Sequence, residues 1–144
     1  MTGFSVVEID GVIPQSGKIP VTMEVSPPPT AIPFSHLYET TIAGFGTVTD
    51  EIPVPAGKQA TLTSIYIGGQ DVGSVASRVY VYKTTDGVTD EKIFIGYMPG
   101  NEGQVFVEEV LEGSATSKFK IVRERLDGRS KIVFARVQGY MVDV

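Results

Sequence analysis

The chain has 144 residues, of which 42% are hydrophobic and 20% charged, so it can build the core of one domain. A formal net charge of −5 argues against a nucleic-acid binder, which needs excess Lys and Arg. Cysteine is absent, which excludes disulfides, thiol nucleophiles and cysteine–zinc sites. No stretch approaches the roughly 20 apolar residues of a membrane span, and the first residues lack signal-peptide character. We therefore expect a protein made in a cytoplasm, without nucleic-acid or membrane partners.

The first 36 residues differ from the rest of the chain in composition. Six of the nine prolines lie between Met1 and Pro33, together with only four charged residues. Because proline blocks helices and central strands, this segment is expected to be extended. Disordered tails are usually poor in apolar groups, so we expect residues 1–36 to be an arm that docks on another copy or another protein. The expected contact anchors are Phe4, Val6, Ile9, Ile13, Val21, Val25, Ile32 and Phe34.

From Leu37 onward, apolar residues recur with a period of two, which indicates strands. The runs are rich in the β-branched and aromatic residues that suit a pleated sheet. We predict strands at residues 38–48, 50–54, 59–67, 77–83, 92–98, 104–111, 117–125 and 131–142. About eight short strands predict a single antiparallel β-sandwich or jelly roll over residues 37–144.

One predicted strand, residues 59–67, does not keep a single alternation. Leu62 belongs to one apolar phase and Ile65 to the other. A bulge at Thr63–Ser64, or burial on both faces, would explain the slip.

Turn signals separate the predicted strands at fairly regular intervals. Asp86–Gly87 and Asp127–Gly128 are hairpin signals, because both residue types tolerate positive φ. We therefore predict that each pair joins two neighbouring strands of one sheet.

The chain offers little for catalysis. His36 is its only histidine, so a two-histidine metal site is excluded, and no Gly-x-Ser-x-Gly elbow accompanies it. Acidic pairs such as Asp50–Glu51 lie within strands, where neighbouring side chains point to opposite faces. We predict a protein that is not an enzyme, with no catalytic, cofactor-binding or metal-ligating residues.

A basic cluster near the C-terminus has two interpretations. If the last two strands form a hairpin about Asp127–Gly128, much of the cluster gathers in one region. It is then either an ordinary solvated sheet face or a docking patch for an acidic protein surface. The residues of the possible patch are Lys118, Lys120, Arg123, Arg125 and Arg129.

The sequence Val54–Pro55–Ala56–Gly57–Lys58, with the strand that follows, resembles a turn found in small β-sandwich structural proteins of tailed bacteriophages. The closing residues Val137–Val142 are similar to the terminal strand of those proteins. Together the similar segments, about residues 47–83 and 131–142, cover a third of the chain. Within this group, the capsid decoration (cement) proteins are the best match in size.

The resemblance implies a structural protein of the virion. A decoration protein would bind the outer surface of the capsid as a homo-oligomer, with a trimer expected. It would stabilise the shell through the major capsid protein, and its arm would reach neighbouring subunits. Two alternatives remain open: a head-completion, tail or fibre-base protein, and a carbohydrate- or receptor-binding β-module. The module would use exposed aromatics, for which the candidates are Tyr66, Tyr80, Tyr82 and Tyr97.

Overall fold

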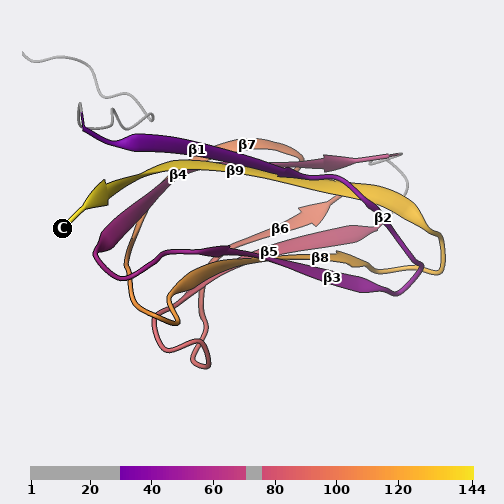
Figure 1. The fold of residues 1–144 in the computed structure, drawn as a ribbon. Helices are drawn as coiled ribbons and strands as arrows, with labels where there is room; N and C mark the ends of the chain where they lie inside the picture. Colours follow the sequence, from indigo (N-terminus) through magenta and orange to yellow (C-terminus); the bar gives the residue numbers. More distant parts are fainter. Residues whose placement is uncertain (1–29, 71–75) are drawn as a thin grey trace, which may run out of the picture.

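The computed structural model describes residues 30–70 and 76–144, which form two antiparallel sheets packed face to face (Figure 1). One sheet, here called sheet A, has the strand order β1-β9-β4-β7, and the short β2 also pairs with β9. The other, sheet B, has the order β3-β8-β5-β6. The strands are β1 (Ile32–Tyr38), β2 (Thr41–Ile42), β3 (Thr47–Pro53), β4 (Lys58–Gly69), β5 (Ser77–Thr84), β6 (Glu91–Met98), β7 (Gly103–Glu112), β8 (Lys118–Arg125) and β9 (Lys131–Asp143). The predicted β-sandwich is confirmed.

The hydrophobic core lies between the two sheets. Strands β4, β5, β8 and β9 occupy the middle of their sheets, and their alternate residues point inward, as the period of two requires. Fully buried side chains on these strands include Leu62, Val79, Val81, Phe119, Ile121 and Val137. Burial of each such side chain contributes about 1.5–3 kcal/mol to folding.

The predicted irregularity at Thr63–Ser64 is a β-bulge. The register of β4 against both β7 and β9 shifts between Leu62 and Ser64. The shift allows Leu62 and Ile65, which have opposite parity in the sequence, both to be buried. Without the bulge, one half of β4 would turn its apolar residues to solvent.

The prediction of one continuous strand at residues 38–48 is wrong. In its place β1 ends at Tyr38, β2 contains two residues, and a turn leads into β3. The turn contains Phe45 at a φ of 56°, and the amide of Gly46 donates to the carbonyl of Ala43. Tertiary contact imposes this turn, because a Cβ on Gly44 would lie 2.2 Å from the carbonyl oxygen of Gly128.

Strand β1 begins at Ile32 and pairs with β9 over all its residues. Residues 32–36, which the sequence analysis assigned to the arm, thus belong to sheet A. The remaining arm anchors, from Phe4 to Val25, lie outside the described residues.

The two predicted hairpins have different outcomes. Asp86–Gly87 joins β5 to β6, which pair with each other, and Gly87 has a φ of 80°. Asp127–Gly128 instead joins β8 in sheet B to β9 in sheet A, so the second hairpin prediction is wrong. The Asp127 carbonyl accepts from the amide of Phe45, and the Arg125 amide donates to Gly46. These bonds bind the connection to the turn before β3 and direct the chain across to the other sheet.

We predict that Gly139→Ala destabilises the domain by about 1–3 kcal/mol. A Cβ at this position of β9 would lie 2.1 Å from the carbonyl oxygen of Thr61 in β4, and backbone there cannot move without disturbing the central ladder. Gly128→Ala is the matched control, because its Cβ meets only the ring of Phe45 at 3.5 Å. Urea unfolding would measure both; equal losses of stability would contradict this reading.

Candidate interaction surfaces

The structure divides the predicted basic patch between the two faces of β8. Arg123 and Arg125 point inward and are 1% and 2% exposed. Lys118 and Lys120 lie on the outer face, where they form ion pairs with Glu51 and Asp90. Alternation along the strand thus sends these four cations to opposite faces. Arg129 lies beyond β8, in the connection to β9, where it pairs with Asp127 at 3.0 Å, so the five cations do not form one exposed patch.

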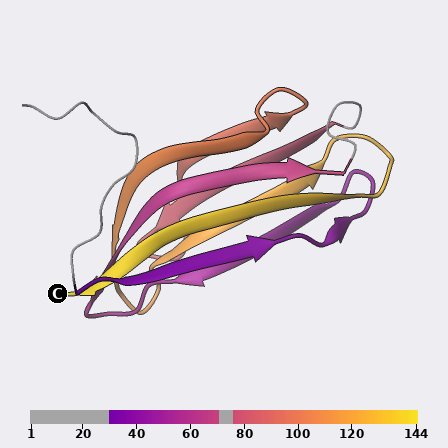
Figure 2. The same ribbon diagram turned by 90° about the horizontal axis from the view of Figure 1, so that it is seen from above.

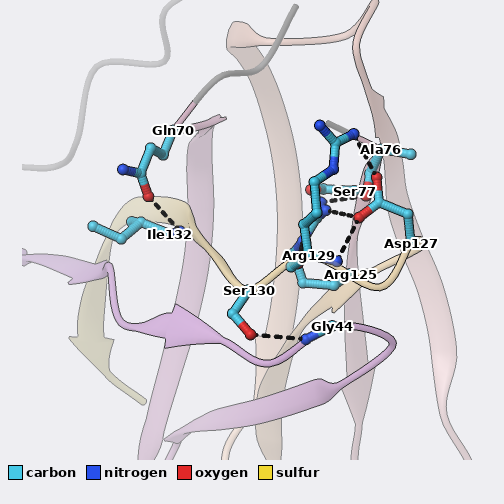
Figure 3. A network of polar contacts seen from close by, with 9 residues as sticks. All are labelled: Gly44, Gln70, Ala76, Ser77, Arg125, Asp127, Arg129, Ser130 and Ile132. Carbon is cyan, nitrogen blue, oxygen red and sulfur yellow. Dashed lines mark hydrogen bonds and ion pairs between the residues drawn. The ribbon is translucent and has the colours of Figure 1, made fainter. Parts of the chain in front are cut away.

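Arg125 anchors one end of the sandwich (Figure 3). Its guanidinium donates to the carbonyls of Arg129 and Ala76, to the hydroxyl of Ser77 and to the carboxylate of Asp127. Every nitrogen of the buried cation therefore has a partner, which offsets the loss of hydration. The acceptors come from the approach to β5 and from the β8–β9 connection, so one side chain joins both.

The same end contains two further polar links (Figure 3). The Gly44 amide donates to the Ser130 hydroxyl at 3.2 Å, and the Ile132 amide donates to the Gln70 side chain at 3.3 Å. Three chain connections are thus held to one another mainly by hydrogen bonds. This arrangement points to a structural role for the cluster.

Arg123 is the second buried cation, deeper between the sheets. It donates to the carbonyl of Val133 at 2.8 Å and to the carboxylate of Asp50 at 3.0 Å, joining β8 to both β9 and β3. Tyr38 lies close by, and burial, followed by the negative charge of Asp50, raises the pKa of its hydroxyl.

We predict that Arg125→Ala lowers the free energy of unfolding by about 3–5 kcal/mol, because it removes a fully buried cation and leaves its acceptors unsatisfied. Lys120→Ala, on the outer face of the same strand, should cost no more than about 1 kcal/mol. Chemical denaturation of both variants tests the contrast. A mild Arg125→Ala phenotype would rule out an anchoring role.

We also predict that Asp127 gives the domain acid-sensitive stability. Hydrogen bonds from Arg129, with the charge of Arg125, hold the pKa of Asp127 well below its usual range. A carboxylate with a lowered folded-state pKa stabilises the fold above the unfolded value of about 3.9, and this contribution is lost as the pH falls toward the folded value. Asp127→Asn should therefore have a lower free energy of unfolding than the wild type near neutral pH. This difference in stability should narrow as the pH falls. Denaturation at a series of pH values measures it; a constant difference would contradict the prediction.

A row of tyrosine and cationic side chains lies across the outer face of sheet B. The Tyr80 and Tyr82 rings stack with centroids 5.8 Å apart. Arg78 lies 4.8 Å from the Tyr80 ring and 5.8 Å from the Tyr97 ring, and Lys92 lies 4.7 Å from Tyr80. These contacts already engage the ring faces that a sugar would need.

Tyr66, the remaining aromatic candidate, lies on the outer face of sheet A. Its ring stacks with Phe134 at 5.6 Å, and Arg136 lies 5.5 Å from the same ring. None of the four tyrosines thus presents an uncommitted stacking platform within the described part of the chain.

The side of the sandwich formed by β6 and β7 exposes apolar residues. The two strands are the outermost members of their sheets on this side, joined by a short connection across it (Figure 2). Ile95 and Tyr97 of β6, which are 38% and 46% exposed, lie beside Tyr80 and Arg78 on the outer face of sheet B. Val105 of β7 is 38% exposed although its register turns it toward the other sheet. Unpaired edges beside exposed apolar residues are suited to protein contact.

An open hollow of about 450 Å³ lies between the β5–β6 connection and the last residues of β7. Its Asp86 carboxylate accepts hydrogen bonds from Thr84 and from the amides of Val88 and Thr89, and the Thr89 amide is the main reason that its pKa is lowered. Lys83 is paired with Glu109 at 3.2 Å. These charges hold the loop in shape, so this hollow is a structural feature.

A second hollow, of about 420 Å³, lies on the outer face of sheet A, over the bulge in β4. None of the residues that line it is charged. They are Pro33, Phe34, Ser35, Thr63, Ser64, Gln104, Phe106, Gln138, Gly139 and Tyr140. We call this hollow the glutamine groove.

The two described arm anchors differ in exposure. Ile32 is 65% exposed, whereas Phe34 packs against the core beside Gly139. Phe34 is thus engaged by its own domain. His36 is exposed on β1 between the rings of Phe34 and Tyr38, at 5.8 and 6.2 Å.

Neither a metal cluster nor a membrane-spanning helix is found in residues 30–70 and 76–144. These residues contain no group of three or more His, Cys, Asp or Glu side chains arranged to hold a metal ion. They also include no helix long and apolar enough to cross a membrane.

No protein-family model and no curated protein sequence matches the chain. Among solved structures, it is similar to the Yersinia pseudotuberculosis-derived mitogen, with a TM-score of 0.53 and 12% identity over 74% of this chain and 86% of the mitogen. Drosophila NLP-core, described for pentamer formation and histone binding, matches with a TM-score of 0.42 and 13% identity over 74% of this chain and 98% of its own. A desmodium yellow mottle tymovirus structure matches with a TM-score of 0.35 and 11% identity, over 79% of this chain and 91% of its own. Of these three, the mitogen alone exceeds a TM-score of 0.5, and at this identity the likeness concerns the fold.

Proposed function

We propose that the protein is a non-enzymatic structural component of a virus particle, binding the outer surface of the capsid as a homo-oligomer and stabilising the shell. The observation that carries the proposal is that β6 and β7 form edges with no further strand among the described residues, and that Ile95 and Tyr97 of β6 and Val105 of β7 are exposed on these two strands. Burial of such a surface against other copies would remove apolar area from water. A trimer is the expected state.

The attachment of the arm supports the same proposal. The arm leads directly into β1, whose seven residues are all paired with β9, and β9 pairs in turn with β4. A force on the arm would therefore act along β1, and β1 could detach only if many of its hydrogen bonds to β9 broke together. We propose that residues 1–29 lace onto neighbouring subunits and the major capsid protein, so that strain in the shell is carried into the sheet.

The charged residues are consistent with a non-enzymatic role. The described acidic side chains Asp50, Asp90 and Glu124 are engaged in ion pairs. Arg123 and Arg125 hold the sheets and connections together. These particular charged side chains thus have structural partners.

The two alternatives from the sequence gain no observation at the residues that were predicted to carry them. A head-completion, tail or fibre-base protein would use the same surfaces in fewer copies, and the number of copies per particle separates it from a decoration protein. A receptor-binding module built on Tyr66, Tyr80, Tyr82 and Tyr97 is disfavoured, because cations or other rings already engage these aromatics.

The first test of this proposal is removal of residues 1–29, which ends before β1. The truncated domain should keep the thermal stability of the full chain, because β1 and its pairing with β9 remain. It should no longer pellet with undecorated phage shells in co-sedimentation, whereas the full chain should pellet at a stoichiometry near that of the shell subunit. Equal binding by the two forms would disprove the role of the arm, and failure of the full chain to bind would refute capsid decoration.

A second test addresses the oligomer. Ile95→Glu places a charge on the exposed β6 side and should convert a trimer into monomers, as measured by analytical ultracentrifugation. Thr49→Glu is the matched control, because it adds the same charge to an exposed position of β3, at the other edge of sheet B. If the wild type is monomeric at all concentrations, or both variants behave alike, the β6–β7 contact is wrong.

A further inference from the structure

The glutamine groove has the chemistry of a binding site, although the proposed function makes no use of it. Its floor is one row of side chains across four strands of sheet A. Figure 2 shows the ribbon of these strands from the outer side of the sheet. Register places Ser64 of β4 beside Phe106 of β7 and beside Gln138 of β9, and Gln138 beside Ser35 of β1. At the usual strand separation, this row spans about 14 Å.

The polar groups of the floor are held in place by one another. The Ser64 hydroxyl donates to the side-chain oxygen of Gln138 at 3.0 Å, and the Thr63 hydroxyl donates to the main-chain oxygen of Gln138 at 3.2 Å. The first bond orients the Gln138 amide and leaves its two N–H donors for a ligand, since no described residue accepts from them. Gln104 adds a second amide at the β7 side.

Apolar surfaces border this polar floor. Phe106, which is 37% exposed, and Tyr140 line the groove together with Pro33. Unlike Tyr66 and Tyr80, neither aromatic is stacked on another described ring or cation. A ligand would therefore meet amides and hydroxyls beneath it and rings beside it.

We propose that the glutamine groove binds a neutral oligosaccharide. The absence of charge in its lining gives a phosphate, carboxylate or ammonium group no counter-charge. Amides and hydroxyls pair with sugar hydroxyls, and aromatic rings pack against the apolar faces of pyranose rings. A volume of about 420 Å³ lies in the range of small-ligand sites and suits a short oligosaccharide.

An extended peptide is the main competitor, and the floor disfavours it. Peptides commonly bind sheets by adding a strand to a free edge. Two of the four strands beneath the groove, β4 and β9, are central and already paired on both sides, so the middle of the groove offers a peptide no backbone ladder. Recognition must come from side chains, which favours a ligand rich in hydroxyls.

The test uses the ¹⁵N-labelled full chain, titrated by NMR with neutral cello-, malto-, manno- and chito-oligosaccharides of several units. At least one series should shift the side-chain amide signals of Gln104 and Gln138 and saturate at millimolar concentration or below. Gln104→Ala and Tyr140→Ala should each weaken that binding by about tenfold. Tyr82→Ala, on the outer face of sheet B, should leave it unchanged.

Three results would overturn the assignment. One is the absence of saturable shifts with all four series. Another is that a charged uronic-acid oligosaccharide binds as tightly as the neutral sugars, because the uncharged lining would then not select a neutral ligand. The last is a synthetic peptide of residues 1–29 that shifts the two glutamine amides while the sugars do not. None of these results depends on capsid binding or on the oligomeric state.

Discussion

The antiparallel ladder between β4 and β9 is the constraint on which the rest of the structure depends. Its closest point is Gly139, where a side chain would collide with the Thr61 carbonyl. The ladder contains the bulge that lets both halves of β4 face the core. It also supports β1 on one side and β7 on the other, and so sets the outer face on which the glutamine groove lies.

Two buried arginines donate hydrogen bonds to backbone carbonyls that hydrophobic packing leaves without partners. The chains that cross between the sheets bring backbone carbonyls to the end of the sandwich, and a buried carbonyl needs a donor. Arg125 supplies several donors at once to the connections there, while Arg123 reaches from sheet B to the backbone of sheet A. A planar guanidinium suits this task because its donors point in several fixed directions.

The surfaces that we assign to different roles occupy different faces and edges of the sandwich. The β6–β7 side presents apolar residues at two strand edges, and β1 carries the arm at the opposite edge of sheet A. The glutamine groove opens on the outer face between them. An assembly through the two edges would leave that face available, so shell binding and sugar binding are compatible in one particle.

The sequence by itself determined the all-β class, most strand positions, an irregularity at Thr63–Ser64 and the hairpin at Asp86–Gly87. These features depend on local alternation and turn chemistry, which are properties of neighbouring residues. Only the tertiary structure decided that Asp127–Gly128 joins two sheets, that residues 32–36 form a strand, and that Arg123 and Arg125 are buried. It alone assembled the glutamine groove, whose floor takes Ser35, Ser64, Phe106 and Gln138 from four strands. The physical reason is that sheet membership and register depend on contacts between distant segments, which alternation within a strand does not encode.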